Sequence, residues 1–77
     1  MKADLKKADL QRAVLHGADL QEADLQEAQL AEADFTRVNF QKANLSNAKL
    51  SKAILHHALL RNATLTRADL FLLPQQM

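Results

Sequence analysis

Residues 3–12 read ADLKKADLQR, and this stretch contains the pattern that decides the fold. Alanine and leucine stand two residues apart, and two polar residues separate each leucine from the next alanine. The unit of five runs without a gap from residue 3 to residue 72, fourteen times in all. Every fifth residue from Leu5 to Leu70 is leucine, apart from Phe35 and Phe40, and Val38 replaces one alanine.

A period of five excludes an amphipathic helix, although 14 alanines and 15 leucines in 77 residues favour a helix on propensity alone. Five residues advance an ideal helix by about 500°, so successive leucines would lie about 140° apart and form no stripe. An alanine and a leucine two apart instead fit a three-residue strand with two side chains facing inward. Such strands, joined by corners of two residues, wind into a solenoid whose coils stack through backbone hydrogen bonds.

Units such as Ala3-Asp4-Leu5, Ala8-Asp9-Leu10 and Ala23-Asp24-Leu25 resemble the repeats of the pentapeptide-repeat family. The resemblance covers nearly the whole chain and implies an all-β fold, a right-handed quadrilateral β-helix with four pentapeptides per coil. It implies about 3.5 coils, with residues 1–72 as a single β-helix and residues 73–77 as a short C-terminal tail or cap. The chain departs from the family's Asp or Asn between alanine and leucine at Val14, Gln29, Lys49, Ile54, Leu59 and Thr64.

With four units in each coil, the leucines fill the shaft, and the alanines sit near the corners, where a larger side chain would collide. Phe35 and Phe40 are predicted to be core residues on consecutive faces of the second coil. Asp4, Asp24 and Asn44 are predicted to stack in one column, and short polar side chains of this kind bond the turn backbone. We therefore interpret this column as structural.

The net charge of +1 conceals coils of alternating sign. Residues 1–20 carry +1, residues 21–40 carry five acids and one arginine (−4), residues 41–60 carry +3, and the remainder carries +1. Stacking predicts charge pairs between corners, which disfavour a slipped register. The predicted pairs are Lys2–Glu22, Glu22–Lys42, Lys7–Glu27, Arg12–Glu32 and Glu32–Lys52. The acidic stretch from Asp19 to Asp34 forms a belt around the shaft, which we interpret as structural rather than as an acidic binding site.

The sequence contains no constellation that would carry catalysis, so we expect the chain not to be an enzyme. No nucleophile stands beside a base, and Gly17 alone cannot make a glycine-rich phosphate loop. His16 and His56 share a column at roughly 10 Å, too far apart for one metal ion. A filled shaft also leaves no room for a pocket. We expect no catalytic residue, no metal site and no cofactor.

Outward-facing apolar residues form the candidate interface. This interface comprises Ile54, Leu59, Phe71, Leu72 and Leu73, and Val14 also faces outward. The last three residues of the interface either fold over the open end of the shaft as a plug or join the other two in a self-association surface. Both alternatives stay open and are compatible. The N-terminal end exposes strand edges. Either the charges of nearby lysines prevent these edges from pairing with other chains, or the edges stack on another copy or on the repeats of a partner.

These features favour a non-enzymatic structural or protein-interaction module, a rigid rod that self-associates or stacks with a protein partner, as a homodimer or end to end. The alternative is a DNA mimic that binds DNA gyrase or topoisomerase, as the quinolone-resistance members of the family do. The near-neutral charge, the single acidic coil and the short chain argue against a mimic.

Composition also bounds the compartment and the partners. Basic residues are scattered among acids and no aromatic residue is predicted to be exposed within the repeats, which argues against nucleic-acid binding. No apolar run approaches the ~20 residues of a membrane span, and the start lacks the apolar region of a signal peptide. We therefore expect a cytoplasmic protein with no membrane segment. The resemblance points to bacteria, and to cyanobacteria in particular.

Overall fold

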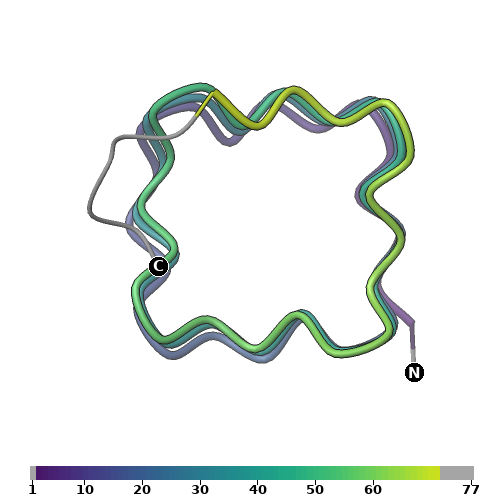
Figure 1. Ribbon diagram of the computed structural model, residues 1–77, viewed down its shortest axis with the longest axis horizontal. Coiled ribbons are helices and arrows are strands. Elements are labelled where there is room, and N and C mark those ends of the chain that lie inside the picture. The colour runs from purple at the N-terminus through teal and green to yellow at the C-terminus, as the bar shows by residue number, and fades with distance from the viewer. Residues whose placement is uncertain (1, 72–77) are drawn as a thin grey trace.

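The computed structural model describes residues 2–71, which wind into stacked square coils around a common axis (Figure 1). Each coil has four walls, and each wall is one five-residue unit. Residues 20 positions apart lie above one another, because every β-bridge among the described residues joins such a pair in parallel, Asp4 with Asp24 being the first. The coil of four five-residue units that the resemblance implied is therefore observed.

We number the walls in chain order and identify each by the residues at its centre. The first wall carries Asp4, Asp24, Asn44 and Thr64, and the second carries Asp9, Gln29, Lys49 and Asp69. The third wall carries Val14, Asp34 and Ile54, and the fourth carries Asp19, Asn39 and Leu59.

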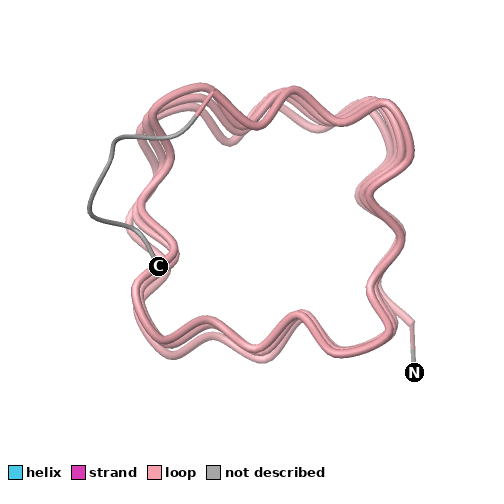
Figure 2. Cartoon of the chain, in the orientation of Figure 1, coloured by secondary structure: helices cyan, strands magenta, loops and turns pink. Residues whose placement is uncertain are grey.

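Backbone hydrogen bonds join each coil to its neighbours. The wall-centre N–H donates to the preceding coil, as from Asp24 N to Ala3 O at 2.9 Å. The following leucine donates to the next coil, as from Leu25 N to Asn44 O at 2.7 Å. Residues 2–71 contain only isolated bridges and turns, with no helix and no longer strand, so Figure 2 draws them as loop throughout. The expected three-residue strands are reduced to single bridges because a corner follows within two residues.

Each corner is a β-turn with a left-handed residue. The alanine after the corner donates to the leucine before it, as from Ala8 N to Leu5 O at 3.0 Å. φ is positive at every fifth residue from Lys7 (61°) to Arg67 (59°), in twelve non-glycine residues and in Gly17 (68°). A positive φ at the third residue of the turn is the pattern of a type II turn, where glycine or asparagine is usual. The sequence did not reveal this conformation, because lysine, arginine and glutamate occupy most of these positions.

Inward-facing residues of the middle coils fill the shaft, as predicted. Their fractional exposure is 1% or less at Ala23, Leu25, Ala28, Leu30, Ala33, Phe35, Val38, Phe40, Ala43, Leu45, Ala48, Leu50 and Ala53. The two phenylalanine rings pack edge to face, with centroids 5.1 Å apart and planes at 74°. Replacement of two leucines by larger rings is thus accommodated within the shaft, and Val38 beside them is fully buried.

The described residues form a β-helix-like repeat fold. No helix in this part of the chain is long and apolar enough to cross a membrane. The predicted tail at residues 73–77 lies outside the described residues, as does Leu72, so the boundary at residue 72 stays a prediction.

Candidate interaction surfaces

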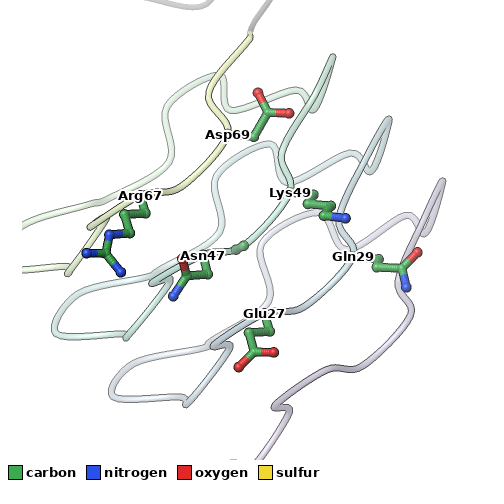
Figure 3. Close-up of a pocket in the computed structure, with 7 residues that line it drawn as sticks. Glu27, Gln29, Asn47, Lys49, Arg67 and Asp69 are labelled. Atoms are coloured by element: carbon green, nitrogen blue, oxygen red, sulfur yellow. The ribbon is translucent and has the colours of Figure 1, made fainter.

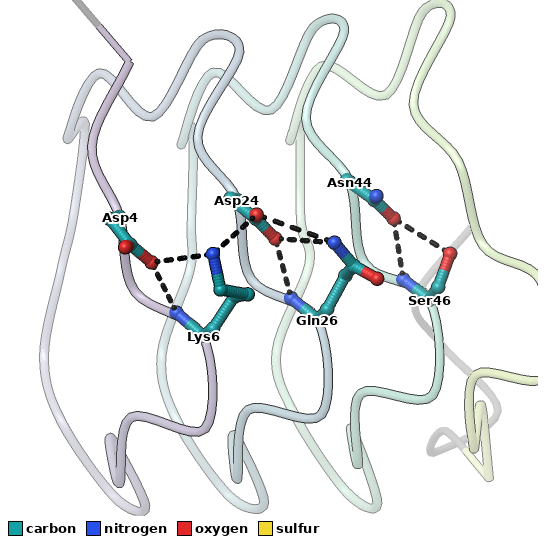
Figure 4. Close-up of polar contacts among 6 residues, drawn as sticks. All are labelled: Asp4, Lys6, Asp24, Gln26, Asn44 and Ser46. Atoms are coloured by element: carbon teal, nitrogen blue, oxygen red, sulfur yellow. Dashed lines mark hydrogen bonds and ion pairs between the residues drawn. The ribbon is translucent and has the colours of Figure 1, made fainter.

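Short polar side chains at the wall centres hold the corners. Figure 4 shows this on the first wall, where the Oδ1 atoms of Asp4, Asp24 and Asn44 accept from backbone N–H groups two residues later, at 3.0 to 3.2 Å. The same bond recurs at Asp9, Asp19, Asp34, Asn39 and Asp69. The predicted structural role of the first-wall column is confirmed, since each bond satisfies a turn donor that the ladder between coils does not use.

Three basic side chains reach from the first coil to acids of the second. Lys6 Nζ lies 3.3 Å from Asp24 Oδ2 and 3.5 Å from Asp4 Oδ1 (Figure 4). His16 Nε2 contacts Asp34 Oδ2, an ion pair when the imidazole is protonated. Lys6 and His16 each stand 18 residues before their acid in the second coil, and Gln11 Nε2 donates to Gln29 Oε1 over the same offset, at 2.9 Å.

Only one of the corner pairs predicted from the sequence forms among the described residues. Arg12 Nε lies 3.2 Å from Glu32 Oε1. The other four predicted pairs are not within ion-pair distance: Lys2–Glu22, Glu22–Lys42, Lys7–Glu27 and Glu32–Lys52. Corner residues with positive φ are exposed, and water solvates long charged side chains there at little cost, so stacking alone does not pair them. Sequence reasoning missed Lys6 and His16, and the 18-residue offset is the signal that would have identified them.

Burial and hydrogen bonding act in opposite directions on Asp24. Partial burial by itself would raise the pKa of its carboxyl group, but bonds from the Gln26 N–H and side chain and from Lys6 together lower it. The pKa of Asp34 is also lowered, first by the hydroxyl of Thr36 and then by the Thr36 N–H and His16, against the effect of burial. The pKa of Lys6 is raised by its hydrogen bond to Asp24 and by the charges of Asp4 and Asp24. These polar contacts thus favour the charged form of all three groups.

A shallow open groove runs along the second wall beside the preceding corner (Figure 3). Its lining comprises Glu27, Gln29, Asn47, Ala48, Lys49, Arg67 and Asp69. Ala48 lies between the corner column and the wall-centre column and points its side chain into the shaft, so no side chain projects outward there. The expectation of no pocket is therefore wrong for the surface, because the columns on either side of this position leave a furrow outside the shaft. The groove is lined by two acidic and two basic residues, so their charges cancel. No nucleophile lies beside a base in its lining.

Histidines do not gather into a metal site in the described residues. His16 lies in the first coil against Asp34, whereas His56 and His57 occupy a corner of the third coil. Within residues 2–71 no group of three or more histidine, cysteine, aspartate or glutamate side chains is placed to hold a metal ion.

The predicted interface residues lie on different parts of the surface. Leu59, at the centre of the fourth wall, is 50% exposed, and Ile54, at the centre of the third, is half-buried. Phe71 follows the second wall at the end of the described chain and is 68% exposed. Leu72 and Leu73 lie outside the described residues. Val14, at the centre of the third wall in the first coil, is 73% exposed, more than any other large apolar residue within 2–71.

Comparisons with known proteins identify the repeat. A family model described as pentapeptide repeats matches residues 1–37 and 38–71. The solved pentapeptide repeat protein Rfr23 from the cyanobacterium Cyanothece 51142 is 32% identical over 91% of this chain and 52% of its own, with a TM-score of 0.59. HetL, a pentapeptide repeat protein involved in heterocyst differentiation regulation from the cyanobacterium Nostoc sp. strain PCC 7120, is 26% identical over 97% of this chain and 53% of its own, with a TM-score of 0.32. The chain spans about half the length of both. No curated protein sequence matches.

Proposed function

This chain belongs to the pentapeptide-repeat family, and on that premise we propose that it is a non-enzymatic structural or protein-interaction module that self-associates. Its repeats form a right-handed rod that presents fixed columns of side chains. The chain in Figure 1 runs counter-clockwise from the faded purple coil toward the nearer yellow one, which supports this winding sense. The solved protein Rfr23, to which this chain is similar, comes from a cyanobacterium, which supports the expected bacterial origin.

Exposed apolar side chains on a rigid frame carry the proposal. Val14, Leu59 and Phe71, which lie outside the shaft, are between 50% and 73% exposed. These exposed side chains contribute little to the stability of the fold. Burying them against another surface would remove apolar area from water and would therefore lower the free energy. Because hydrogen bonds between coils already fix the walls, little conformational entropy is lost when such a surface binds.

The DNA-mimic alternative receives less support. A mimic must present its acids to a basic partner, whereas Asp24, Glu32 and Asp34 are each engaged by a basic side chain of the first coil. The acids of the second coil also encircle the rod and do not line one wall. We expect the protein to leave the supercoiling activity of DNA gyrase unchanged in vitro, and inhibition or protection of the enzyme would support the mimic instead.

Solution mass tests the proposal. We expect the mass of the 77-residue chain, measured by sedimentation equilibrium, to rise above that of a monomer as concentration increases. Leu59→Ser and Phe71→Ser each replace an exposed apolar group and should weaken association without lowering the unfolding temperature. Thr64→Ser is the matched control, since it changes a polar wall centre. A monomer at every concentration would contradict self-association.

A further inference from the structure

Basic residues that lack an acidic partner gather in the later part of the repeat. Between Asp34 and Asp69 the sequence contains six lysine and arginine residues, two histidines and no acid. The six are Arg37, Lys42, Lys49, Lys52, Arg61 and Arg67. All six are exposed, and within residues 2–71 none of them forms an ion pair. This stretch therefore presents positive charge that the chain itself does not neutralise.

The fourth wall places part of this charge on both sides of an apolar side chain. Its centre in the third coil is Leu59, which is 50% exposed, and His57 and Arg61 stand two residues before and after it. Arg37 and Lys42 flank the same wall in the second coil. Backbone bonds from Arg37 N to His56 O at 2.8 Å and from Lys42 N to Arg61 O at 3.0 Å hold these corners beside those of the third coil.

The combination of charge and apolar surface distinguishes this wall. Leu59 is the one exposed large apolar residue of the basic stretch 35–68. The two bases in the groove of the second wall lie beside two acids (Figure 3). The acids of the fourth wall, Asp19 and Glu22, belong to its first unit, residues 18–22, whereas units 38–42 and 58–62 contain none. The surface of these two later units fits an anionic partner that also carries an apolar group.

The spacing along the wall indicates the shape of that partner. An extended chain points alternate side chains to one side and advances by ~3.3 Å per residue, so its pattern repeats every two residues. His57, Leu59 and Arg61 follow the same alternation. A peptide laid along the wall would therefore place an apolar side chain against Leu59 and an acidic side chain against the base on either side.

We infer that units 38–42 and 58–62 of the fourth wall, with Arg37 and His57 before them, bind an extended acidic segment of another protein, in which one acidic residue lies on each side of an apolar residue. The inference goes beyond the proposed self-association, since the partner is a different chain. A second copy supplies the acids poorly, because Asp24, Glu32 and Asp34 are already engaged by bases of the first coil. Nucleic acid supplies negative charge but offers Leu59 no aliphatic contact.

Fluorescence anisotropy tests the inference with a labelled peptide that contains glutamate, serine, leucine, serine and glutamate in that order. We expect the 77-residue chain to bind this peptide. Replacing the leucine of the peptide by serine should weaken binding about fivefold, because the contact with Leu59 is lost. No binding of the peptide would overturn the inference. Equal binding of a short thymidine oligonucleotide of the same charge would also overturn it, since charge alone would then explain the contact.

Paired substitutions locate the surface. Arg37→Gln with Arg61→Gln removes one charge from each side of Leu59 and should weaken peptide binding about fivefold. Lys49→Gln with Arg67→Gln is the matched control, since it removes the same charge from the second wall, and should change binding less than about twofold. An equal loss in both variants would show a response to net charge and overturn the inference. Both variants keep every exposed apolar residue, so sedimentation equilibrium of each tests self-association separately.

Discussion

The first and second coils are built from the same five-residue unit, yet only the second is sealed from solvent. Leu25 and Leu30 have no exposed surface, whereas Leu5 and Leu10 are half-buried. The second coil has a neighbour on both sides and the first has one among the described residues. In a stacked repeat, the contribution of a residue to the free energy of unfolding depends on its position in the stack as much as on its identity.

Truncating side chains of the shaft should show the largest difference in stability between the first and second coils. Phe40→Ala removes a fully buried ring and should lower the free energy of unfolding by about 3–5 kcal/mol. Leu5→Ala, at a half-buried site, should cost about 1 kcal/mol. Urea denaturation followed by circular dichroism measures both. Should Phe40→Ala fail to fold, Phe40→Leu gives a milder loss. Equal costs at the two sites would show that position in the stack does not matter.

Substitutions at corner residues with positive φ should change the free energy of unfolding less than core truncations do. Their effect should be the same in every coil. A Cβ atom at Gly17 would meet no atom within 4 Å, so Gly17→Ala carries only the strain of a φ of 68° and should cost about 1 kcal/mol. Lys42→Gly, at a corner of the third coil where φ is 62°, should stabilise by about 0.5 kcal/mol. Ser51→Gly, at a corner residue with ordinary φ, is the control and should destabilise. If Lys42→Gly destabilises as much as the control, the positive φ costs nothing.

Acid should weaken the junction between the first two coils. Asp24 and Asp34 have lowered pKa values in the folded protein, so their stabilisation is present above the unfolded pKa of about 4 and is lost as pH falls through the folded values. Thermal unfolding between pH 6 and pH 2 measures this loss. Asp34→Asn keeps an oxygen that accepts from Thr36 and should flatten the pH dependence. An unchanged acid slope in the combined Asp24→Asn and Asp34→Asn variant would contradict the assignment.

The smallest effect should come from the corner ion pair. Arg12 and Glu32 have side chains that are 81% and 50% exposed, so a double-mutant cycle should assign their interaction less than about 0.5 kcal/mol. That value should shrink further in 1 M salt. A coupling above about 1 kcal/mol that persists in high salt would mean that the pair fixes the register of the first coil on the second.

Residue spacing predicted the buried positions, and fourteen repeats state the period of five clearly. The period alone does not fix the number of walls in a coil. The coil of 20 residues came from the resemblance to the pentapeptide-repeat family, and the turn-bonding column at Asp4, Asp24 and Asn44 follows from that coil. The positive φ at corners could not be predicted, because lysine and glutamate there give no sign of it. The charge pairs were mostly misassigned because a stacking rule places Cα atoms, whereas Lys6 and His16 pair through side-chain reach. Exposure of Leu59 and Phe71 followed from the period, but the half-burial of Ile54 depends on its neighbours.

The direction of the bonds between coils has a mechanical consequence. All of these bonds point along the rod, so a force that pulls its two ends apart loads one coil's bonds at a time, as in a zipper. Each rupture would release 20 residues, about 70 Å of extended chain. A force directed across the walls would instead load every bond of a coil junction together. The rod is therefore weak when stretched and stiff when sheared.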